Sequence, residues 1–315
     1  MYKKLLLLFI ILSLFFIPIL AKQAPDLKLA DQRKEKKCDI MISVTGVDEP
    51  IPLEEYVVGV VAGEMPADFH EEALKAQVIA ARTYAARNTD KGAKPIAKDV
   101  SAQVYRTEAE RKERWGKAFK QNEKKIRKAA EATRGDIIVH GEEIISAMFF
   151  STSNGKTEAA QNFSGNPVEY LQSVDSPGEE KVAPTVERKL QMTLTEWNRK
   201  LGLKWDADEF RELQLVRNQT GRVQKIITGN YETSGRQVRE KLNLASTDFN
   251  IAYDVNNQIV HITTLGYGHG VGMSQYGAEA YAQKGWTADK ILSHYYTGTR
   301  IQKINLPEDE CLKSS

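Results

Sequence analysis

The chain has 315 residues, enough for about two domains and a sizeable hydrophobic core. Hydrophobic residues make up 41% and charged residues 27%, which is ordinary for a globular protein and excludes both wholesale disorder and a multi-span membrane protein. The formal net charge of +2 creates no strong field, so no nucleic-acid partner is expected. Two cysteines, Cys38 and Cys311, exclude a disulfide-dense scaffold and a multi-cysteine zinc site.

The N-terminal segment predicts the compartment. Residues 5–21 are uncharged, follow two lysines within residues 1–4, and are near the shortest length that spans a hydrocarbon core. The lysines predict that the N-terminus stays in the cytoplasm. A cleaved signal peptide is the alternative, but bulky Ile19 stands where the usual cut requires a small residue. We expect an uncleaved transmembrane anchor, a flexible tether over residues 22–37, and an exported domain over residues 38–305.

Two helices are predicted at the start of that domain. The first begins at Pro52, with two glutamates in its first turn, and ends around Glu64. The second begins near Asp68, with Glu71 as its capping-box partner, and reaches about Asn88. Its core-facing stripe at helical spacing is Leu74, Val78, Ala81 and Ala85.

Two cations stand out on the second helix. Lys75 and Arg82 are seven positions apart and lie about a quarter turn from the apolar stripe. Because side chains at this spacing point the same way, we expect both to meet the same partner.

Residues 106–131 predict an exposed amphipathic helix, inserted into the domain. Its narrow apolar seam is Trp115, Phe119, Asn122, Ile126 and Ala130. The segment holds ten lysines and arginines against five glutamates. This excess could attract an anionic wall polymer or lipid, and a merely solvated face is the simpler interpretation.

From residue 136 onward the pattern changes to strands. A hairpin is predicted from residues 137–139 and 144–150, followed by a polar loop. The later expected elements are a helix over 193–203, strands near 213–217, 222–228 and 258–264, and helices through Tyr281 and over 291–296. Hairpins and segregated helices together predict an α+β fold, with a mixed or antiparallel sheet in a single globular region.

Glu64 is the strongest candidate for acid–base chemistry. It stands where the first helix breaks, among apolar neighbours that would raise the pKa of its carboxyl group by desolvation. A carboxylic acid that stays protonated near neutral pH can donate a proton to a leaving oxygen and later take one back. A glutamate at a helix end that simply faces solvent is the alternative interpretation.

Other kinds of site find less support. None of the five histidines has a zinc-ligand spacing, so no metal is expected. The glycine run 266–272 around His269 lacks a nucleotide-binding context, and it predicts either a backbone cradle for a ligand or a tight structural turn. Ser151 and Ser153 lack a nucleophile elbow and an evident triad.

Five blocks of sequence resemble one known family in the same order. They are EEYVVGVVAGEMP (54–66), ALKAQVIAARTYA (73–85), STSNGKTE (151–158), EYLQSV (169–174) and GHGVGMSQYGA (268–278). Together, behind an N-terminal anchor, they resemble the stage II sporulation protein D family of endospore-forming bacteria. The resemblance covers residues from about 40 to 300.

The resemblance implies a membrane-bound lytic transglycosylase that cleaves peptidoglycan glycan strands while the forespore is engulfed. It places Glu64 at the position of the catalytic acid/base, and Lys75 and Arg82 at positions that matter for activity. Such an enzyme needs one carboxyl group, because the sugar's own C6 hydroxyl closes a 1,6-anhydro ring. The other matching positions imply substrate-binding or supporting roles for Ser151, Ser153, Thr157, Tyr170, His269 and Gln275.

The resemblance also implies partners and a location. The partners would be a cell-wall amidase, sporulation protein P, which strips stem peptides, and the membrane sporulation protein M. The location would be the mother-cell membrane, with the C-terminal domain outside the cytoplasm and facing the forespore. Some clostridial relatives bind zinc through cysteines and a histidine. This chain has His140 in that region but no cysteine, so no metal or other cofactor is carried over.

Two competing functions remain open from the sequence. One is a non-catalytic, glycan-binding activator of a cell-wall amidase. The other is an ordinary muramidase hydrolase, with Asp68, Glu71 or Glu72 as a second carboxylate. The reaction products distinguish the three functions, as anhydro ends, reducing ends or no cleavage.

Overall fold

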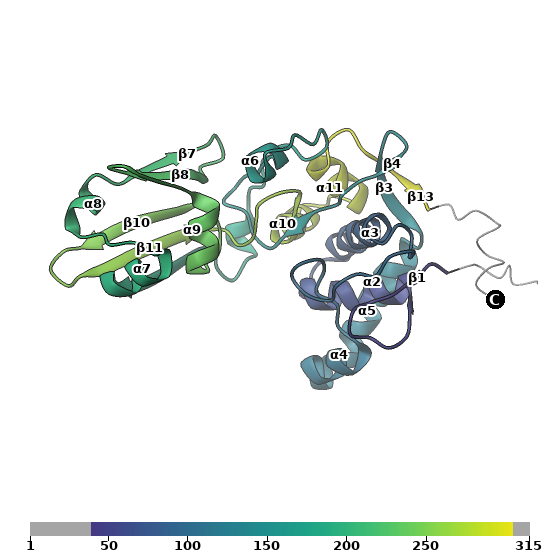
Figure 1. Ribbon diagram of the computed structural model, residues 1–315. Coiled ribbons are helices and arrows are strands. Elements are labelled where there is room, and N and C mark those ends of the chain that lie inside the picture. The colour runs from purple at the N-terminus through teal and green to yellow at the C-terminus, as the bar shows by residue number, and fades with distance from the viewer. Residues whose placement is uncertain (1–38, 305–315) are drawn as a thin grey trace, which may run out of the picture. The chain divides into compact units, whose positions relative to one another are not determined.

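A computed structural model describes residues 39–304 of the chain (Figure 1). The expected anchor at 5–21, the tether at 22–37 and both cysteines lie outside these residues. Within the described range, no helix combines the length and apolar character needed to cross a bilayer.

Helices and strands alternate irregularly along the chain. The helices are α2 (Leu53–Glu64), α3 (Glu71–Asn88), α4 (Glu108–Trp115), η1 (Gly116–Ala118), α5 (Phe119–Ala132), α6 (Ala160–Ser164), η2 (Glu179–Lys181), α7 (Leu194–Leu201), α8 (Ala207–Arg211), α9 (Gly235–Leu242), α10 (Gln275–Gln283) and α11 (Ala288–Tyr295). The strands are β1 (Met41–Ile42), β2 (Ile51–Pro52), β3 (Asp136–His140), β4 (Glu143–Ile144), β5 (Phe149–Phe150), β6 (Glu187–Thr193), β7 (Gln214–Arg217), β8 (Val223–Thr228), β9 (Tyr231–Ser234), β10 (Phe249–Asp254), β11 (Ile259–Leu265), β12 (Met273–Ser274) and β13 (Arg300–Lys303).

The first hydrophobic core surrounds α3. This helix packs against α2, α5, α10, α11 and β3. Its alanines, several of them fully buried, let the neighbouring helices approach closely. The predicted stripe of Leu74, Val78, Ala81 and Ala85 is buried, so that prediction is confirmed.

The predicted start of the second helix is wrong by two residues. His70, and not Asp68, is the N-cap of α3, and its Nδ1 accepts a hydrogen bond from the Glu72 amide at 3.2 Å. The His70 imidazole therefore accepts a hydrogen bond from the Glu72 amide in the first turn of α3, and it takes the capping role that was expected of Asp68.

The expected continuous helix over residues 106–131 is interrupted. Gly116 adopts a φ of +48° and ends α4, and a short 3-10 turn leads into α5. The seam is also less apolar than predicted, because buried Arg111 lies in it and donates to Glu55 at 2.8 Å and to Glu123 at 3.0 Å. Partial exposure of Asn122 is a second departure from the predicted seam.

The predicted hairpin is confirmed only in its first half. β3 and β4 pair antiparallel, with Val139 opposite Ile144. The continuation of the second strand to Phe150 is wrong, because β5 separates from it and pairs in parallel with β12. This pairing brings residues 149–150 beside residues 273–274, more than 120 positions away in the chain.

A second hydrophobic core lies within residues 187–265. One antiparallel sheet has the strand order β10-β11-β6 and the other β7-β8-β9, which confirms the strands predicted in this region. Trp197, Trp205 and Phe210 pack among the buried aliphatic residues, with ring centroids 5.3–5.7 Å apart. The described chain is thus an α+β protein with predominantly antiparallel sheets, and its globular region holds two hydrophobic cores.

Candidate active site

Glu64 is the last residue of α2, and the sequence that follows explains why the helix ends there. Met65 has an extended backbone, with φ of −129° and ψ of 143°, as expected for a residue that precedes proline. The Glu64 side chain is half-buried, and its Oε1 accepts a hydrogen bond from the Val104 amide at 2.7 Å. No described residue donates a hydrogen bond to Oε2, and this atom is not fully enclosed.

Two glycines allow the segment that carries Val104 to approach α2. A Cβ at Gly63 would lie 2.1 Å from the Val104 carbonyl oxygen, and one at Gly59 would lie 2.3 Å from the Tyr105 ring. Real Cβ atoms do not approach so closely, so any larger residue would push this segment away. Since Gly59 and Gly63 are four positions apart, they share one face of α2. That face positions the amide that holds Glu64.

A buried polar residue fixes the same segment from the other side. Gln103 accepts a hydrogen bond from the Tyr56 hydroxyl at 3.2 Å and donates to the Ala81 carbonyl at 3.3 Å. The rings of Tyr56 and Tyr105 stack with centroids 5.3 Å apart. The segment therefore joins α2 to α3 beside Glu64, and sequence inspection did not identify Gln103.

The electrostatic surroundings of Glu64 favour its protonated form. Burial raises the pKa of the carboxyl group, and the Val104 amide opposes this with a smaller lowering effect. No lysine or arginine in the described part of the chain contributes to the pKa of Glu64. Burial and the Glu64 charge also raise the pKa of Tyr84, so its hydroxyl stays neutral near the site.

The loop after Glu64 is anchored to the C-terminal helices. Glu279 on α10 accepts a hydrogen bond from the His70 amide at 2.7 Å. The Phe69 ring packs edge-on against Tyr276, with centroids 5.0 Å apart. Glu72 accepts a hydrogen bond from the Ala288 amide at 2.7 Å, in the first turn of α11. These contacts hold the break between α2 and α3 in place.

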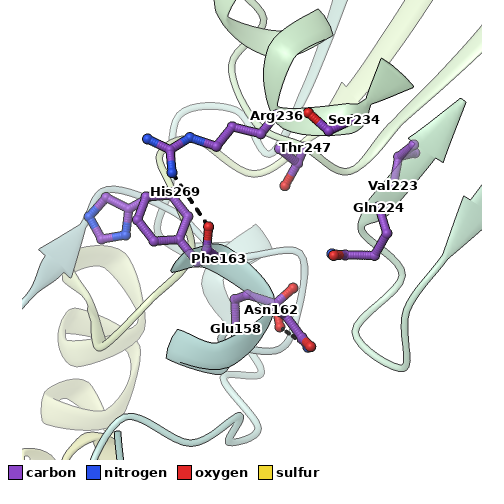
Figure 2. Close-up of a pocket in the computed structure, with 9 residues that line it drawn as sticks. All are labelled: Glu158, Asn162, Phe163, Val223, Gln224, Ser234, Arg236, Thr247 and His269. Atoms are coloured by element: carbon purple, nitrogen blue, oxygen red, sulfur yellow. Dashed lines mark hydrogen bonds between the residues drawn. The ribbon is translucent and has the colours of Figure 1, made fainter. Parts of the chain in front are cut away.

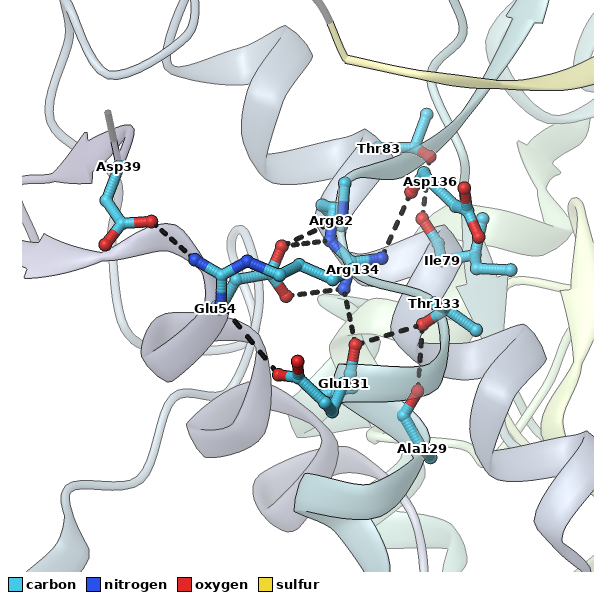
Figure 3. Close-up of polar contacts among 12 residues, drawn as sticks. Asp39, Glu54, Ile79, Arg82, Thr83, Ala129, Glu131, Thr133, Arg134 and Asp136 are labelled. Carbon is cyan, nitrogen blue, oxygen red and sulfur yellow. Dashed lines mark hydrogen bonds and ion pairs between the residues drawn. The ribbon is translucent and has the colours of Figure 1, made fainter. Parts of the chain in front are cut away.

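The expectation that Lys75 and Arg82 share a partner is wrong. Lys75 bonds Glu72 at 2.8 Å and lies 3.4 Å from Glu71, and both acids belong to its own helix. Arg82 is fully buried and forms a two-pronged ion pair with Glu54, at 3.0 and 2.6 Å (Figure 3).

Arg82 also donates to the backbone carbonyl group of Asp136 at 3.1 Å (Figure 3) and to that of Ala130 at 3.3 Å. Its guanidinium thereby joins α2, α5 and β3. The arrangement makes Arg82 a support for the helix that carries Glu64, because the Arg82 side chain has no exposed surface for a substrate.

The blocks at 151–158 and 268–278 lie together through backbone hydrogen bonds. Ser151 accepts from the Tyr276 amide at 3.0 Å, and the Glu158 amide donates to the Gly270 carbonyl at 2.7 Å. Gln275 is buried and its amide nitrogen lies 3.5 Å from the Gln77 side-chain oxygen on α3. Ser151 and Gln275 thus lie near the start of α10, and their proposed substrate-binding or supporting roles stay predictions.

Three other predicted residues have internal roles. Thr157 is buried, and its hydroxyl accepts from the Val174 amide at 2.9 Å. Tyr170 accepts from the Ser146 amide at 3.0 Å. Ser153 donates to Glu179 at 2.6 Å, and no described hydrogen bond links any of the three to Glu64.

Glu179 is a buried carboxylate that the sequence did not reveal. It accepts hydrogen bonds from the Ser153 amide and hydroxyl and from the Ser176 hydroxyl, at 2.6–2.8 Å, and it is only 2% exposed. Burial raises the pKa of Glu179, and the hydroxyl donors oppose the shift. Because its oxygens are occupied and enclosed, Glu179 acts inside the fold. A single glutamate in a proline-rich loop gives no sequence signal of this kind.

His269 has a fixed tautomer. Its Nδ1 accepts from the Val271 amide at 3.0 Å, which leaves Nε2 to donate to the Phe149 carbonyl at 3.0 Å. Burial, with help from nearby Arg239, lowers the pKa of His269 to about 4, so the ring is neutral at physiological pH. The glycine run thus forms a structural turn around this ring.

A cavity of about 210 Å³ lies beside His269 (Figure 2). Its polar lining comes from α6 and the loop before it, from β8, β9 and α9, and from the loop before β10. These lining residues are Glu158, Asn162, Gln224, Ser234, Arg236 and Thr247. Glu158 is occupied by Asn162, Asn218 and Thr220 at 2.6–2.8 Å, and Glu64 does not line this cavity. Within residues 39–304, no three histidine, aspartate or glutamate side chains group as a metal site would require.

The fold and the site together define an α+β protein with a partly buried, protonatable glutamate at a helix break. Residues 43–140, which contain that break, match the family model described as stage II sporulation protein. Stage II sporulation protein D of Bacillus subtilis is 41% identical over 266 residues, covering 82% of this chain and 76% of the relative. Its counterpart in Bacillus amyloliquefaciens is 40% identical over the same shares of the two chains.

The chain therefore belongs to the stage II sporulation protein D family. A more distant relative, named amidase enhancer in Bacillus subtilis, is 28% identical over 298 residues. That match covers 77% of this chain and 40% of the relative.

Proposed function

We propose that the protein is a lytic transglycosylase that cleaves the glycan strands of peptidoglycan, with Glu64 as its acid/base. The observation that carries the proposal is the state of this carboxyl group. It is desolvated, has no cation beside it, and has one oxygen free of hydrogen bonds from the described residues. Buried Glu179, in contrast, has both oxygens occupied by donors.

The proposed reaction uses this one carboxyl group twice. Protonated Glu64 gives its proton to the glycosidic oxygen as the bond to C1 of muramic acid breaks. The resulting carboxylate then takes the proton of the C6 hydroxyl, whose oxygen bonds to C1 and closes the 1,6-anhydro ring. No water is consumed, so a second carboxylate to activate water is not required.

The contacts of the neighbouring acids support the single-carboxylate mechanism over ordinary hydrolysis. Glu71 binds Lys128 at 2.7 Å, and Glu72 binds Lys75 at 2.8 Å and the Ala288 amide. Hydrogen bonds with these donors lower the pKa of both acids. Both therefore serve as structural ion pairs at the start of α3. Asp68 is exposed in the loop.

The proposed setting is the outer side of the mother-cell membrane during engulfment. Residues 5–21 would anchor the chain and residues 22–37 would tether the domain over residues 38–305. The proposed partners are the amidase sporulation protein P, which would supply peptide-free glycan, and the membrane sporulation protein M.

A second function is favoured by one specific finding, the relative named amidase enhancer. In this alternative the protein binds glycan and activates a cell-wall amidase without cleaving glycan itself. Glu64 would then be a structural residue that links α2 to the segment at Val104.

Product analysis distinguishes these functions. The full chain in mild detergent, and the Glu64→Gln variant, are incubated with peptide-free glycan strands, and mass spectrometry identifies the new ends. Fragments with 1,6-anhydro-muramic acid from the wild type alone support the proposal. Reducing ends would establish a hydrolase, and intact strands that remain bound to the protein would establish the activator.

A further inference from the structure

A cavity of about 320 Å³ is bounded by β6, α9 and the segment that follows β11. It reaches the lower size range of small-molecule sites in proteins. Its charged lining residues are all cationic, namely Arg188, Lys189 and Arg239. No residue of the catalytic proposal lines it, so its chemistry is not explained by Glu64.

Two of these cations have no counter-ion. Within the described residues, no carboxylate lies at ion-pair distance from Arg188 or Arg239, whereas Lys189 pairs with Glu187 at 3.3 Å. Nη1 of Arg188 is buried and has no hydrogen-bond partner in the same part of the chain. An enclosed guanidinium donor without an acceptor is costly, which points to an acceptor supplied by a ligand.

Arg239 is only weakly satisfied. Its guanidinium donates to the carbonyl oxygens of Leu244 at 3.3 Å and Ala245 at 3.4 Å, both near the limit of a hydrogen bond. Burial lowers the pKa of Arg239, and the charge of Glu240 opposes this shift without forming an ion pair within the described residues. Arg82 and Arg111, in contrast, each bind a carboxylate, whereas buried Arg222 has no ion pair among the described residues.

An aromatic platform stands beside the cations. The Arg188 guanidinium lies 4.6 Å from the centroid of the Tyr267 ring, and Tyr267 is 49% exposed. Leu190, which is 39% exposed, lines the same cavity. Exposed apolar surface next to unpaired guanidinium groups suits a ligand with one apolar face and one anionic group, such as a carboxylated sugar.

Tyr276, the second residue of α10, packs on Phe69 in the loop that follows Glu64. Burial raises the pKa of the Tyr276 hydroxyl, the Asp68 charge adds to this effect, and the Arg188 charge opposes it. Tyr276 is therefore close enough to both the loop after Glu64 and Arg188 for their charges to act on it.

We propose that the cavity at Arg188, Arg239 and Tyr267 binds the lactyl carboxylate of a muramic acid residue in a peptide-free glycan strand. The inference rests on the proposed function, because that function supplies the glycan. While a stem peptide is attached, the lactyl group is a neutral amide. Hydrolysis of that amide leaves a carboxylate, and planar guanidinium groups bind carboxylates through paired hydrogen bonds. The cavity would thus recognise glycan from which the peptide has been removed.

Binding is measured with the Glu64→Gln variant of the full chain, so that the ligand is not consumed. The ligands are peptide-free glycan strands, the same strands with their carboxylates converted to methylamides, and a glycerol-phosphate polymer. We expect amidation to weaken binding about tenfold or more, as when a charge-assisted hydrogen bond is lost. Equal affinity for the free and amidated strands would overturn the inference. So would tighter binding of the phosphate polymer than of the carboxylated strands.

Variants identify the site. Adding Arg188→Gln should weaken binding of the carboxylated strands about tenfold and leave binding of amidated strands unchanged. The matched control is Lys225→Gln, which removes an exposed cation paired with Glu232 in the same sheet-rich region. If Arg188→Gln weakened both ligands equally, the residue would be structural. These assays do not depend on cleavage, so absent cleavage with carboxylate-dependent binding would contradict only the catalytic proposal.

Discussion

The two hydrophobic cores differ in their composition and in the partners of certain arginines beside them. The core around α3 combines many alanines with valine, isoleucine and tyrosine side chains, and the buried cations Arg82 and Arg111 beside it pair with glutamates. The core within residues 187–265 is built from aromatic and aliphatic side chains, and Arg188 and Arg239 at its edge have no carboxylate partner in the described chain. We interpret the first region as a rigid frame for one protonatable acid and the second as a surface for anion recognition.

The largest expected effect comes from breaking the buried ion pair of the first region. Arg82→Met would leave the Glu54 carboxyl without its two-pronged partner and two carbonyl oxygens without their donor. We expect a loss of about 3–5 kcal/mol in the free energy of unfolding, measured by urea denaturation. The control is Lys225→Met, which breaks an exposed pair in the second region and should cost less than about 1 kcal/mol. Similar losses from both variants would contradict the comparison.

A smaller loss is expected when the glycine face of α2 is filled. Gly63→Ala places a Cβ 2.1 Å from the Val104 carbonyl oxygen, so the segment that holds Glu64 must move. We expect about 1–3 kcal/mol of destabilisation, together with a strong loss of cleavage. Gly141→Ala serves as control, since nothing lies within 4 Å of its added Cβ and only the cost of its φ of +58° remains. Wild-type cleavage by Gly63→Ala would show that the Val104 contact is dispensable.

The pH dependence should follow the raised pKa of Glu64. Cleavage needs the protonated acid, so kcat/KM should fall as pH rises through a pKa above the ordinary glutamate value of 4.5. Because the folded pKa exceeds the unfolded one, the stability contributed by Glu64 is complete below the unfolded pKa. It is lost as pH rises through the folded pKa.

Lys75→Gln should have the smallest effect. Lys75 pairs with Glu71 and Glu72, so the pH at which kcat/KM falls should not move. The free energy of unfolding should change by less than about 1 kcal/mol. The measurement is kcat/KM as a function of pH. If Lys75→Gln moved the pH at which kcat/KM falls, Lys75 would act on the pKa of Glu64, which contradicts this account.

Local sequence patterns predicted helices α2 and α3, but they could not predict which residues the side chains of these helices contact. The spacing of Leu74 and Val78 identified the core face of α3, because helical periodicity is a property of neighbouring residues. The separate partners of Lys75 and Arg82 depend on where Glu54 lies after folding, which no spacing within α3 encodes. The same holds for the Val104 amide, which is 40 residues away from Glu64.

The second region shows the same limit more clearly. Its strands near 213–217, 222–228 and 258–264 were predicted, whereas β6, β9 and β10 were not. Nothing in the sequence distinguishes Arg188, which has no carboxylate partner among the described residues, from Arg217, which binds Asp248 at 3.0 Å. Whether a cation has a partner depends on tertiary contacts. The candidate acid could therefore be found from the sequence, and the candidate anion site could not.

We assign cleavage to Glu64 and carboxylate binding to Arg188. The most direct test is to measure the cleavage rate and the binding affinity separately on one substrate. Single-turnover cleavage and equilibrium binding of peptide-free glycan are compared for the wild type, Glu64→Gln and Arg188→Gln. Glu64→Gln should lower the cleavage rate by about 10²–10⁴ with little change in Kd. Arg188→Gln should raise Kd and retain the cleavage rate at saturation. Cleavage by Glu64→Gln at the wild-type rate would contradict the central claim that this carboxyl group performs the chemistry.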